Sequence, residues 1–273
     1  MAFVETYLDS GLAVVTMTQS QNGNRLNKES LEELSQALDS CVENSHVKAI
    51  LLRSNGKTFC LGMDLESFQK AGKDKTNIKK QVELYKDMLL KIYKAPKPVI
   101  ALINGDVKAG GLGLVAACDT VISSENSTFE LSEVLLGIIP ANVLPFLLLR
   151  GISLQKARYL ILAAKKLSAI EAKENHLVDE VFPEERLEKE LKAIIKNIFR
   201  AAPHALAETK NFTRSISLKD VDEAGDMAVK KLMELINKPE VIKAITDFNE
   251  GELPIWFSKF RPKQPLVKGG HRE

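Results

Sequence analysis

Short apolar runs that end in glycine-bearing or polar turns alternate along the chain with longer segments whose apolar residues recur every three or four positions. The short runs predict buried strands, and the longer segments predict helices. Strands are expected at 3–7, 12–17, 47–53, 99–103, 120–123 and 179–182. Helices are expected at 31–41, 82–92, 114–118, 169–174, 187–200, 203–213, 221–235 and 239–248.

Two strand–turn–helix units follow one another in the first half of the chain. The strand at 47–53 leads to Gly62, and the strand at 99–103 leads to Gly110 and Gly111. Successive units of this kind favour an α/β fold with parallel strands. From residue 153 onward the pattern is mainly helical.

Local signals refine these elements. Asn27 is placed to cap the helix at 31–41, and Ser168 precedes Glu171 at capping-box spacing. In the helix at 82–92, one face collects four apolar or aromatic residues. These are Val82, Tyr85, Leu89 and Ile92.

Two further stretches are distinctive in composition. The lysine-rich stretch at 70–80 predicts a mobile surface loop. The most apolar stretch, 134–149, contains Gly137, Pro140 and Pro145. A membrane helix needs roughly 20 consecutive apolar residues, so this stretch predicts a buried segment instead.

Composition places the 273-residue chain among ordinary globular proteins, with 45% hydrophobic and 27% charged residues. The formal net charge of +2 gives no case for binding nucleic acid or an anionic membrane. Three cysteines, Cys41, Cys60 and Cys118, cannot form a disulfide framework and fit a reducing compartment. No histidine or cysteine pair has zinc-ligand spacing. The absence of a signal-peptide pattern makes the cytoplasm the expected location, and no metal is expected.

The glycine turns carry the candidate chemistry. Each places backbone N–H groups near a helix start, at Gly62–Met63 and at Gly110–Gly111, and such groups favour an anion. Neither turn continues into the Gly-Lys-Ser/Thr of a phosphate-binding loop, and neither has dinucleotide-binding spacing. The sequence therefore predicts a site for an oxyanion other than phosphate.

These turns belong to a longer set of motifs. FCLGMD at 59–64, KPVIALING at 97–105, AGG at 109–111 and FELSEVLLGIIP at 129–140 stand in this order. Together they resemble the signature of the crotonase superfamily of enoyl-CoA hydratases and isomerases. The resemblance implies an α/β fold with a spiral core of ββα turns and a C-terminal helical trimerisation region. On this basis we expect the core at 1–195, the helical oligomerisation region at 196–257 and a tail at 258–273.

The resemblance also implies the site. The amides of Met63 and Gly110 would polarise a thioester carbonyl, with Leu61 and Gly111 beside the substrate. Glu133 matches the second of the two glutamates that hold water in family hydratases, whereas Gly113 stands at the position of the first. One carboxylate can move a proton but is less suited to adding water. The pattern therefore favours an isomerase or a specialised dehydratase.

A closer resemblance is to the dehydratases of polyketide β-branching, which act on 3-hydroxy-3-methylglutaryl groups held on an acyl carrier protein. It rests on AGGLGLV at 109–115, LSE at 131–133, PANVLPFL at 140–147 and GELP at 251–254. It implies no cofactor beyond the phosphopantetheine of the carrier protein or CoA, and a homotrimer or a dimer of trimers. The alternatives are an enoyl-CoA isomerase or hydratase and a catalytically silent binding subunit.

Four further residues have two possible roles each. Asp64 either fixes the oxyanion turn or takes part in the chemistry. Tyr85 either packs in the core or donates to the leaving hydroxyl. Lys108 is either a solvated surface cation or a partner for a substrate carboxylate or phosphate. Asn142 either caps the next helix or binds the substrate. The lysines of 70–80 or the basic tail are expected to dock an acidic carrier protein.

Overall fold

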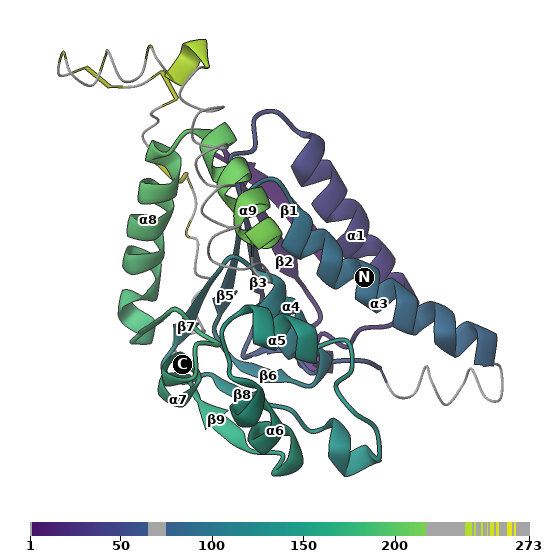
Figure 1. The fold of residues 1–273 in the computed structure, drawn as a ribbon. Coiled ribbons are helices and arrows are strands. Elements are labelled where there is room, and N and C mark those ends of the chain that lie inside the picture. Colours follow the sequence, from purple (N-terminus) through teal and green to yellow (C-terminus); the bar gives the residue numbers. More distant parts are fainter. Residues whose placement is uncertain are drawn as a thin grey trace.

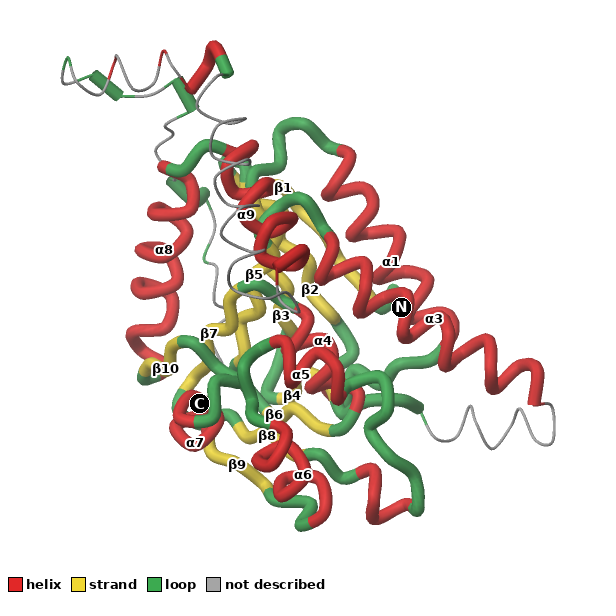
Figure 2. Tube along the Cα trace, in the orientation of Figure 1, coloured by secondary structure: helices red, strands yellow, loops and turns green. Residues whose placement is uncertain are grey.

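Two sheets form the frame of the molecule in the computed structural model (Figures 1 and 2). The structure describes residues 2–64 and 75–216, except the side chains of 75–78, together with 238–241, 243, 247, 250, 252–253, 255–256, 261–263 and 265. The larger sheet is ordered β1 (Val4–Asp9), β2 (Leu12–Met17), β3 (Ala49–Ser54), β5 (Val99–Ile103), β7 (Thr120–Ser124) and β10 (Glu180–Phe182). The smaller sheet is ordered β4 (Thr58–Cys60), β6 (Asp106–Lys108), β8 (Thr128–Glu130) and β9 (Lys166–Ser168).

The chain winds as a spiral in which each turn supplies one strand to each sheet. The pairs β3 and β4, β5 and β6, and β7 and β8 follow one another in this way. Strands from successive turns pair in parallel, whereas the β1–β2 and β8–β9 pairs are antiparallel. The predicted α/β class with parallel strands is confirmed.

Helices cover both faces of the larger sheet (Figure 1). On one face, α8 (Glu184–Arg200) buries an apolar stripe that contains Leu187, Leu191, Ile195 and Phe199. The other face packs against the smaller sheet together with α1 (Lys28–Glu43), α3 (Lys75–Lys94) and α4 (Gly110–Ala117). The remaining elements are η1 (Ser20–Asn22), η2 (Glu133–Leu136), α5 (Leu144–Leu149), α6 (Leu154–Leu162), α7 (Ala169–Glu174) and α9 (Pro203–Ile216). None of the helices in the described part of the chain is both long and apolar enough to span a bilayer.

Both predicted helix caps are confirmed. The Asn27 side chain accepts the Ser30 N–H at 2.9 Å, and the Ser30 hydroxyl accepts the Asn27 N–H at 2.8 Å. Ser168 and Glu171 form the same reciprocal arrangement at the start of α7. These bonds satisfy N–H groups that have no partner within the helix, so they fix where α1 and α7 begin.

The start of α3 corrects two predictions. Residues 75–80 are helical, so the prediction of a loop over 70–80 is wrong for them, and the remainder of that stretch lies outside the described residues. Tyr85 and Leu89 are buried as expected, but Val82 is 42% exposed. At about 100° per residue, Val82 stands only about 20° from Leu89 around the helix axis, so the periodicity alone does not account for its exposure.

The apolar stretch at 134–149 is only partly buried. Phe146 and Leu147 pack into the core, but the loop around Gly137 exposes apolar side chains, and Ile139 is 72% exposed. The exposed members of the loop are Leu135, Leu136, Ile138 and Ile139. The prediction of a wholly buried segment is wrong, because the exposed side chains stand on both sides of Gly137, whose φ of 75° ends η2 in a left-handed turn.

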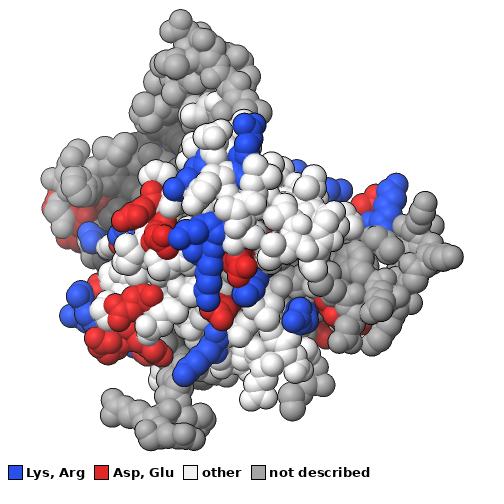
Figure 3. Space-filling view, turned by 90° about the horizontal axis from the view of Figure 1, so that it is seen from below, with Lys and Arg blue, Asp and Glu red and all other residues white. Residues whose placement is uncertain are grey.

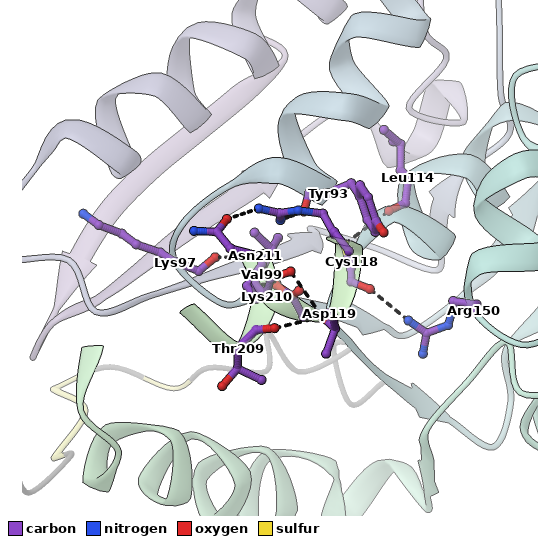
Figure 4. Close-up of polar contacts among 12 residues, drawn as sticks. Tyr93, Lys97, Val99, Leu114, Cys118, Asp119, Arg150, Thr209, Lys210 and Asn211 are labelled. Carbon is purple, nitrogen blue, oxygen red and sulfur yellow. Dashed lines mark hydrogen bonds and ion pairs between the residues drawn. The ribbon is translucent and has the colours of Figure 1, made fainter. Parts of the chain in front are cut away.

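A polar network fastens α9 to the spiral core (Figure 4). The Lys210 ammonium pairs with the Asp119 carboxylate and donates to the Lys97 carbonyl at 3.1 Å. The Asp119 carboxylate also accepts the Val99 N–H at 2.7 Å. Burial raises the pKa of Asp119 and lowers the pKa of Lys210, while their ion pair opposes both shifts. The first helix after Arg200 is therefore docked on its own chain.

The predicted domain division remains a prediction. α8 runs without a break through the expected boundary at residue 195 and ends at Arg200. The predicted helix at 221–235 lies outside the described residues, as do half of 239–248 and most of the tail at 258–273. Near the end of the expected oligomerisation region, the Trp256 ring packs edge-on against His204, with 5.5 Å between the ring centroids.

Candidate active site

The two glycine turns predicted from the sequence touch each other through their backbones. Gly62 has a φ of 85°, and a Cβ atom built on it would lie 2.8 Å from the Gly110 nitrogen. Ala109, the residue before α4, has a φ of 46°, which is rare for a residue with a side chain. Strained conformations of this kind persist only where the surrounding structure imposes them. The close approach therefore requires glycine at position 62.

Two backbone N–H groups at this contact have no acceptor in the described part of the chain. Leu26 bridges the turn on one side, because its N–H donates to the Gly62 carbonyl and its carbonyl accepts the Asp64 N–H, both at 2.8 Å. The Met63 N–H between them points to the opposite side. Gly110 is the first residue of α4, and within the described residues neither its N–H nor that of Met63 donates a hydrogen bond. The pair forms a donor site for an oxyanion.

A buried scaffold holds the first turn in place. The Cys60 thiol donates to the Asn24 carbonyl at 3.2 Å and accepts the Gly62 N–H at 3.4 Å. The Asn24 amide, which is fully buried, donates to the Phe59 carbonyl at 2.9 Å. Burial raises the pKa of Cys60 to about 12, so the thiol is protonated near neutral pH. No role in the site was predicted from the sequence for the Cys60 thiol or for Asn24, and the only signal for Asn24 is its place in the polar segment before α1.

Leu61 and Gly111 have packing roles in the structure. A Cβ atom on Gly111 would lie 2.3 Å from the Cys60 carbonyl oxygen, so glycine permits α4 to lie against β4. The Leu61 side chain covers Gly23, where a Cβ atom would lie 2.7 Å from the Leu61 Cδ1 atom. Their predicted contacts with substrate stay predictions.

Glu133 is placed as a proton acceptor. It opens η2 and is only 7% exposed, and its Oε2 atom is buried without a hydrogen bond. Burial raises the pKa of the Glu133 carboxyl above its ordinary value, although the backbone N–H groups of Glu133 and Ser132 partly oppose the shift. A carboxylate of this kind is a stronger base than one in water.

Tyr85 joins the two halves of the site. Its hydroxyl is buried and donates to the Gly110 carbonyl in the first turn of α4. Burial raises the pKa of Tyr85, and the side chains of Cys60 and Glu133, when ionised, raise it further, so both lie within electrostatic range of Tyr85. The predicted donation to a leaving hydroxyl would require the Tyr85 hydrogen to leave the Gly110 carbonyl.

The other polar candidates have protein partners. The Lys108 ammonium lies 3.0 Å from the Glu130 carboxylate on the neighbouring strand β8. The Asn142 amide donates to the Val82 carbonyl at 3.1 Å. It does not cap α5, because the residue before that helix is Val143 and no side chain caps it. The capping role considered for Asn142 is therefore wrong, and Asn142 instead ties the loop after Glu133 to α3.

Asp64 follows the oxyanion turn directly. Its side chain is half-buried, and its backbone N–H belongs to the bridge with Leu26. The structure thus gives Asp64 a part in fixing the turn through its main chain. A chemical role for its carboxylate stays a prediction.

Comparisons with known proteins agree with this geometry. The sequence profile of the enoyl-CoA hydratase/isomerase family matches residues 8–259. The chain is 31% identical to the bacillaene synthase dehydratase PksH of Bacillus subtilis strain 168, over 92% of this chain and 95% of that protein. It is 28% identical to the trans-2-decenoyl-[acyl-carrier-protein] isomerase of Streptococcus mutans, over 94% and 95% of the two chains.

A solved structure extends the comparison to the fold. An enoyl-CoA hydratase/isomerase from Marinobacter aquaeolei superposes with a TM-score of 0.87 at 27% identity, and the match covers 94% of this chain and all of that one. The spiral, the paired backbone donors and the buried glutamate therefore occur in a chain that matches this family along most of its length. The protein belongs to the enoyl-CoA hydratase/isomerase (crotonase) family and is an enzyme of the hydro-lyase kind that this family contains.

Proposed function

We propose that the protein removes water from a 3-hydroxy-3-methylglutaryl thioester on an acyl carrier protein and yields the 3-methylglutaconyl thioester. One observation carries the proposal. A buried Glu133 carboxylate oxygen without a hydrogen bond accompanies two free backbone donors in a site where position 113 is glycine. Such a site can move a proton next to a thioester, and it has no second carboxylate at position 113 to hold a water molecule.

The reaction follows from these groups. The thioester oxygen accepts the N–H groups of Met63 and Gly110, which stabilise the enolate formed when Glu133 takes a proton from C2. The electron pair of the enolate then forms the C2–C3 double bond, and the C3–O bond breaks. The leaving hydroxyl takes a proton as it departs, so that water is released. Glu133 can return the proton that it took.

The relatives support a proton-transfer enzyme and favour two outcomes. PksH is named a dehydratase, and it matches this chain over nearly its whole length. The Streptococcus mutans relative is named an isomerase of a carrier-bound enoyl group, which supports double-bond migration as the second candidate. Both reactions need one base and an oxyanion site. The name of the isomerase specifies a substrate on an acyl carrier protein, which supports a carrier-bound substrate for this protein.

A carboxylate on the substrate needs a partner in the site. Lys108 is our candidate, and it would exchange Glu130 for the substrate carboxylate. Tyr85 and Asn142 are neutral alternatives whose hydrogens are donated to backbone carbonyls in the free protein. Basic and acidic side chains are interleaved on the face shown in Figure 3, so its described part offers no broad basic field for an acidic carrier protein. Of the proposed docking segments, residues 70–74, the side chains of 75–78 and most of the tail lie outside the described residues.

A comparison of substrates tests the function. We expect the enzyme to dehydrate carrier-bound 3-hydroxy-3-methylglutarate, seen by mass spectrometry as loss of one water, far faster than it hydrates crotonyl-CoA. Lys108→Met should raise KM or lower kcat for the acidic substrate and change little for an uncharged analogue. Equal or faster hydration of crotonyl-CoA would contradict the dehydratase. Migration of a 3-enoyl double bond without dehydration would establish the isomerase.

We also propose a homotrimer or a dimer of trimers. Apolar side chains exposed on η2 and the following loop adjoin α6, where Leu162 is 73% exposed, and such side chains favour burial against another chain. Light scattering at micromolar concentration should give three or six times the mass of one chain. A monomer under these conditions would rule the assembly out.

A further inference from the structure

The space beside Gly113 is filled by a tyrosine hydroxyl. Gly113 lies one turn into α4, and a Cβ atom on it would stand 2.1 Å from the Tyr85 hydroxyl oxygen and 3.1 Å from the Leu89 Cδ1 atom. Real Cβ atoms do not approach oxygen so closely, so any side chain at 113 must displace the hydroxyl. Position 113 is thus glycine because of what stands on α3.

The tyrosine is fixed where it stands. Tyr85 is 4% exposed, and its hydroxyl donates to the Gly110 carbonyl. A Cβ atom on Gly110 would also lie only 3.3 Å from the same oxygen. The hydroxyl therefore packs against both Gly110 and Gly113 and holds the first turn of α4, which carries one of the two oxyanion donors. Swinging the ring aside would leave that carbonyl without this bond.

We propose that Tyr85 determines the reaction specificity of the site by exclusion, because its hydroxyl occupies the space that a second carboxylate, on a side chain at position 113, would need. Adding water to a double bond calls for a second group that positions the water, and Glu133 alone does not supply one. Tyr85 is in this sense a positioning and specificity-determining residue. The inference rests on the proposed function only in assuming that thioesters are the substrates.

Packing is tested first, without any substrate. Gly113→Ala should lower the melting temperature by roughly 2–10 °C, since the methyl group meets the hydroxyl. In a Tyr85→Phe background the same change should lower the melting temperature clearly less, because the 2.1 Å contact is removed and the longer contacts of 3.1 Å with Leu89 Cδ1 and 3.2 Å with the ring Cζ remain, while alanine favours a helix over glycine. Tyr159→Phe, at a tyrosine that is 51% exposed, is the matched control background and should not rescue Gly113→Ala. Equal losses in all three backgrounds would overturn the inference.

The role of Tyr85 in reaction specificity is tested by replacing Tyr85 and Gly113 together. Tyr85→Ala with Gly113→Glu should hydrate crotonyl-CoA at least about tenfold faster than the parent enzyme, whereas Gly113→Glu alone should show no gain. Tyr85→Ala with Gly113→Gln is the control of equal size without a carboxylate. If the glutamate pair melts too low to assay, Tyr85→Ala with Gly113→Asp replaces it, with Gly113→Asn as its control.

The results of the melting and hydration assays can be told apart from a failure of the proposed dehydratase function. A folded acidic pair that hydrates no faster than its amide control would overturn the specificity role, as would a gain from Gly113→Glu alone. Neither assay uses a 3-hydroxy-3-methylglutaryl group, so failure of the dehydratase proposal leaves both readouts intact. The reverse also holds, because dehydration by the parent enzyme does not depend on either variant pair.

Discussion

Glu133→Gln should lower kcat by on the order of 10³-fold or more while the protein stays folded. The amide has the size of the carboxyl but cannot accept a proton, and proton transfer by one positioned group contributes about 10²–10⁴-fold. Glu133 is the buried carboxyl that lies within electrostatic range of Tyr85 beside the oxyanion donors. Turnover on the carrier-bound substrate is the measurement. Glu125→Gln, at an exposed turn between β7 and β8, is the control and should retain full activity.

The pH dependence of the same enzyme should reflect the buried carboxyl. Because burial raises the pKa of Glu133, the proton-accepting form develops only above the ordinary range of a glutamate. The rate should therefore rise with pH through a value higher than that of a solvent-exposed glutamate. If Glu133→Gln dehydrates the substrate at a rate within a few-fold of the parent, Glu133 is not the base, and the Asp64 carboxylate would be tested next.

Stability should change in the opposite direction to activity. A carboxyl whose pKa is raised on folding holds its proton to higher pH in the folded state than in the unfolded state, so the unfolded state binds fewer protons between the two values. The free energy of unfolding then falls as pH rises through the folded pKa. A glutamine at position 133 does not ionise, so Glu133→Gln avoids this fall in the free energy of unfolding. The variant should therefore melt above the parent at neutral pH. The difference should shrink below the ordinary pKa of glutamate.

Periodicity was sufficient for the elements that are long enough to show it. The strand at 99–103 and the helix at 169–174 have the predicted bounds, because each carries a full apolar run or a clear cap. The smaller sheet was not predicted as a set, since each of its strands has three residues and shows no measurable alternation. The start of α4 was also missed, because its small residues have no polar face.

In the candidate site, too, some residues could be predicted from the sequence and others could not. Met63, Gly110 and Glu133 were predicted from motifs, and their roles stay predictions. Among the described residues the two amides have no acceptor, and the Glu133 carboxyl is buried. The partners of Lys108 and Tyr85 could not be predicted from the sequence. The Lys108–Glu130 pair depends on the register between β6 and β8, and the bond from Tyr85 to Gly110 depends on how α3 crosses α4. Contacts of this kind are set by packing between distant segments.

Gly62→Ala should lower kcat by about 10²–10³-fold, comparable to the loss of one oxyanion donor. A methyl group at 62 would lie 2.8 Å from the Gly110 nitrogen and 3.0 Å from the Ala109 Cβ atom, so it would cover one donor and push the two turns apart. Because the thioester oxygen carries most charge in the enolate, the loss should appear in kcat more than in KM.

Gly62→Ala has two effects that must be separated: backbone strain at a positive φ, and the contact of the methyl group with the turn at Ala109 and Gly110. Alanine at the Gly62 φ of 85° costs roughly 1–2 kcal/mol of backbone energy, whatever surrounds it. Gly151 has a φ of 96°, and a Cβ atom there would meet no atom within 4 Å, so Gly151→Ala carries the strain alone. We expect both variants to melt below the parent, with Gly151→Ala retaining near-parental kcat. If Gly62→Ala keeps its kcat, or if Gly151→Ala loses as much, the contact between the two turns is not what stabilises the oxyanion.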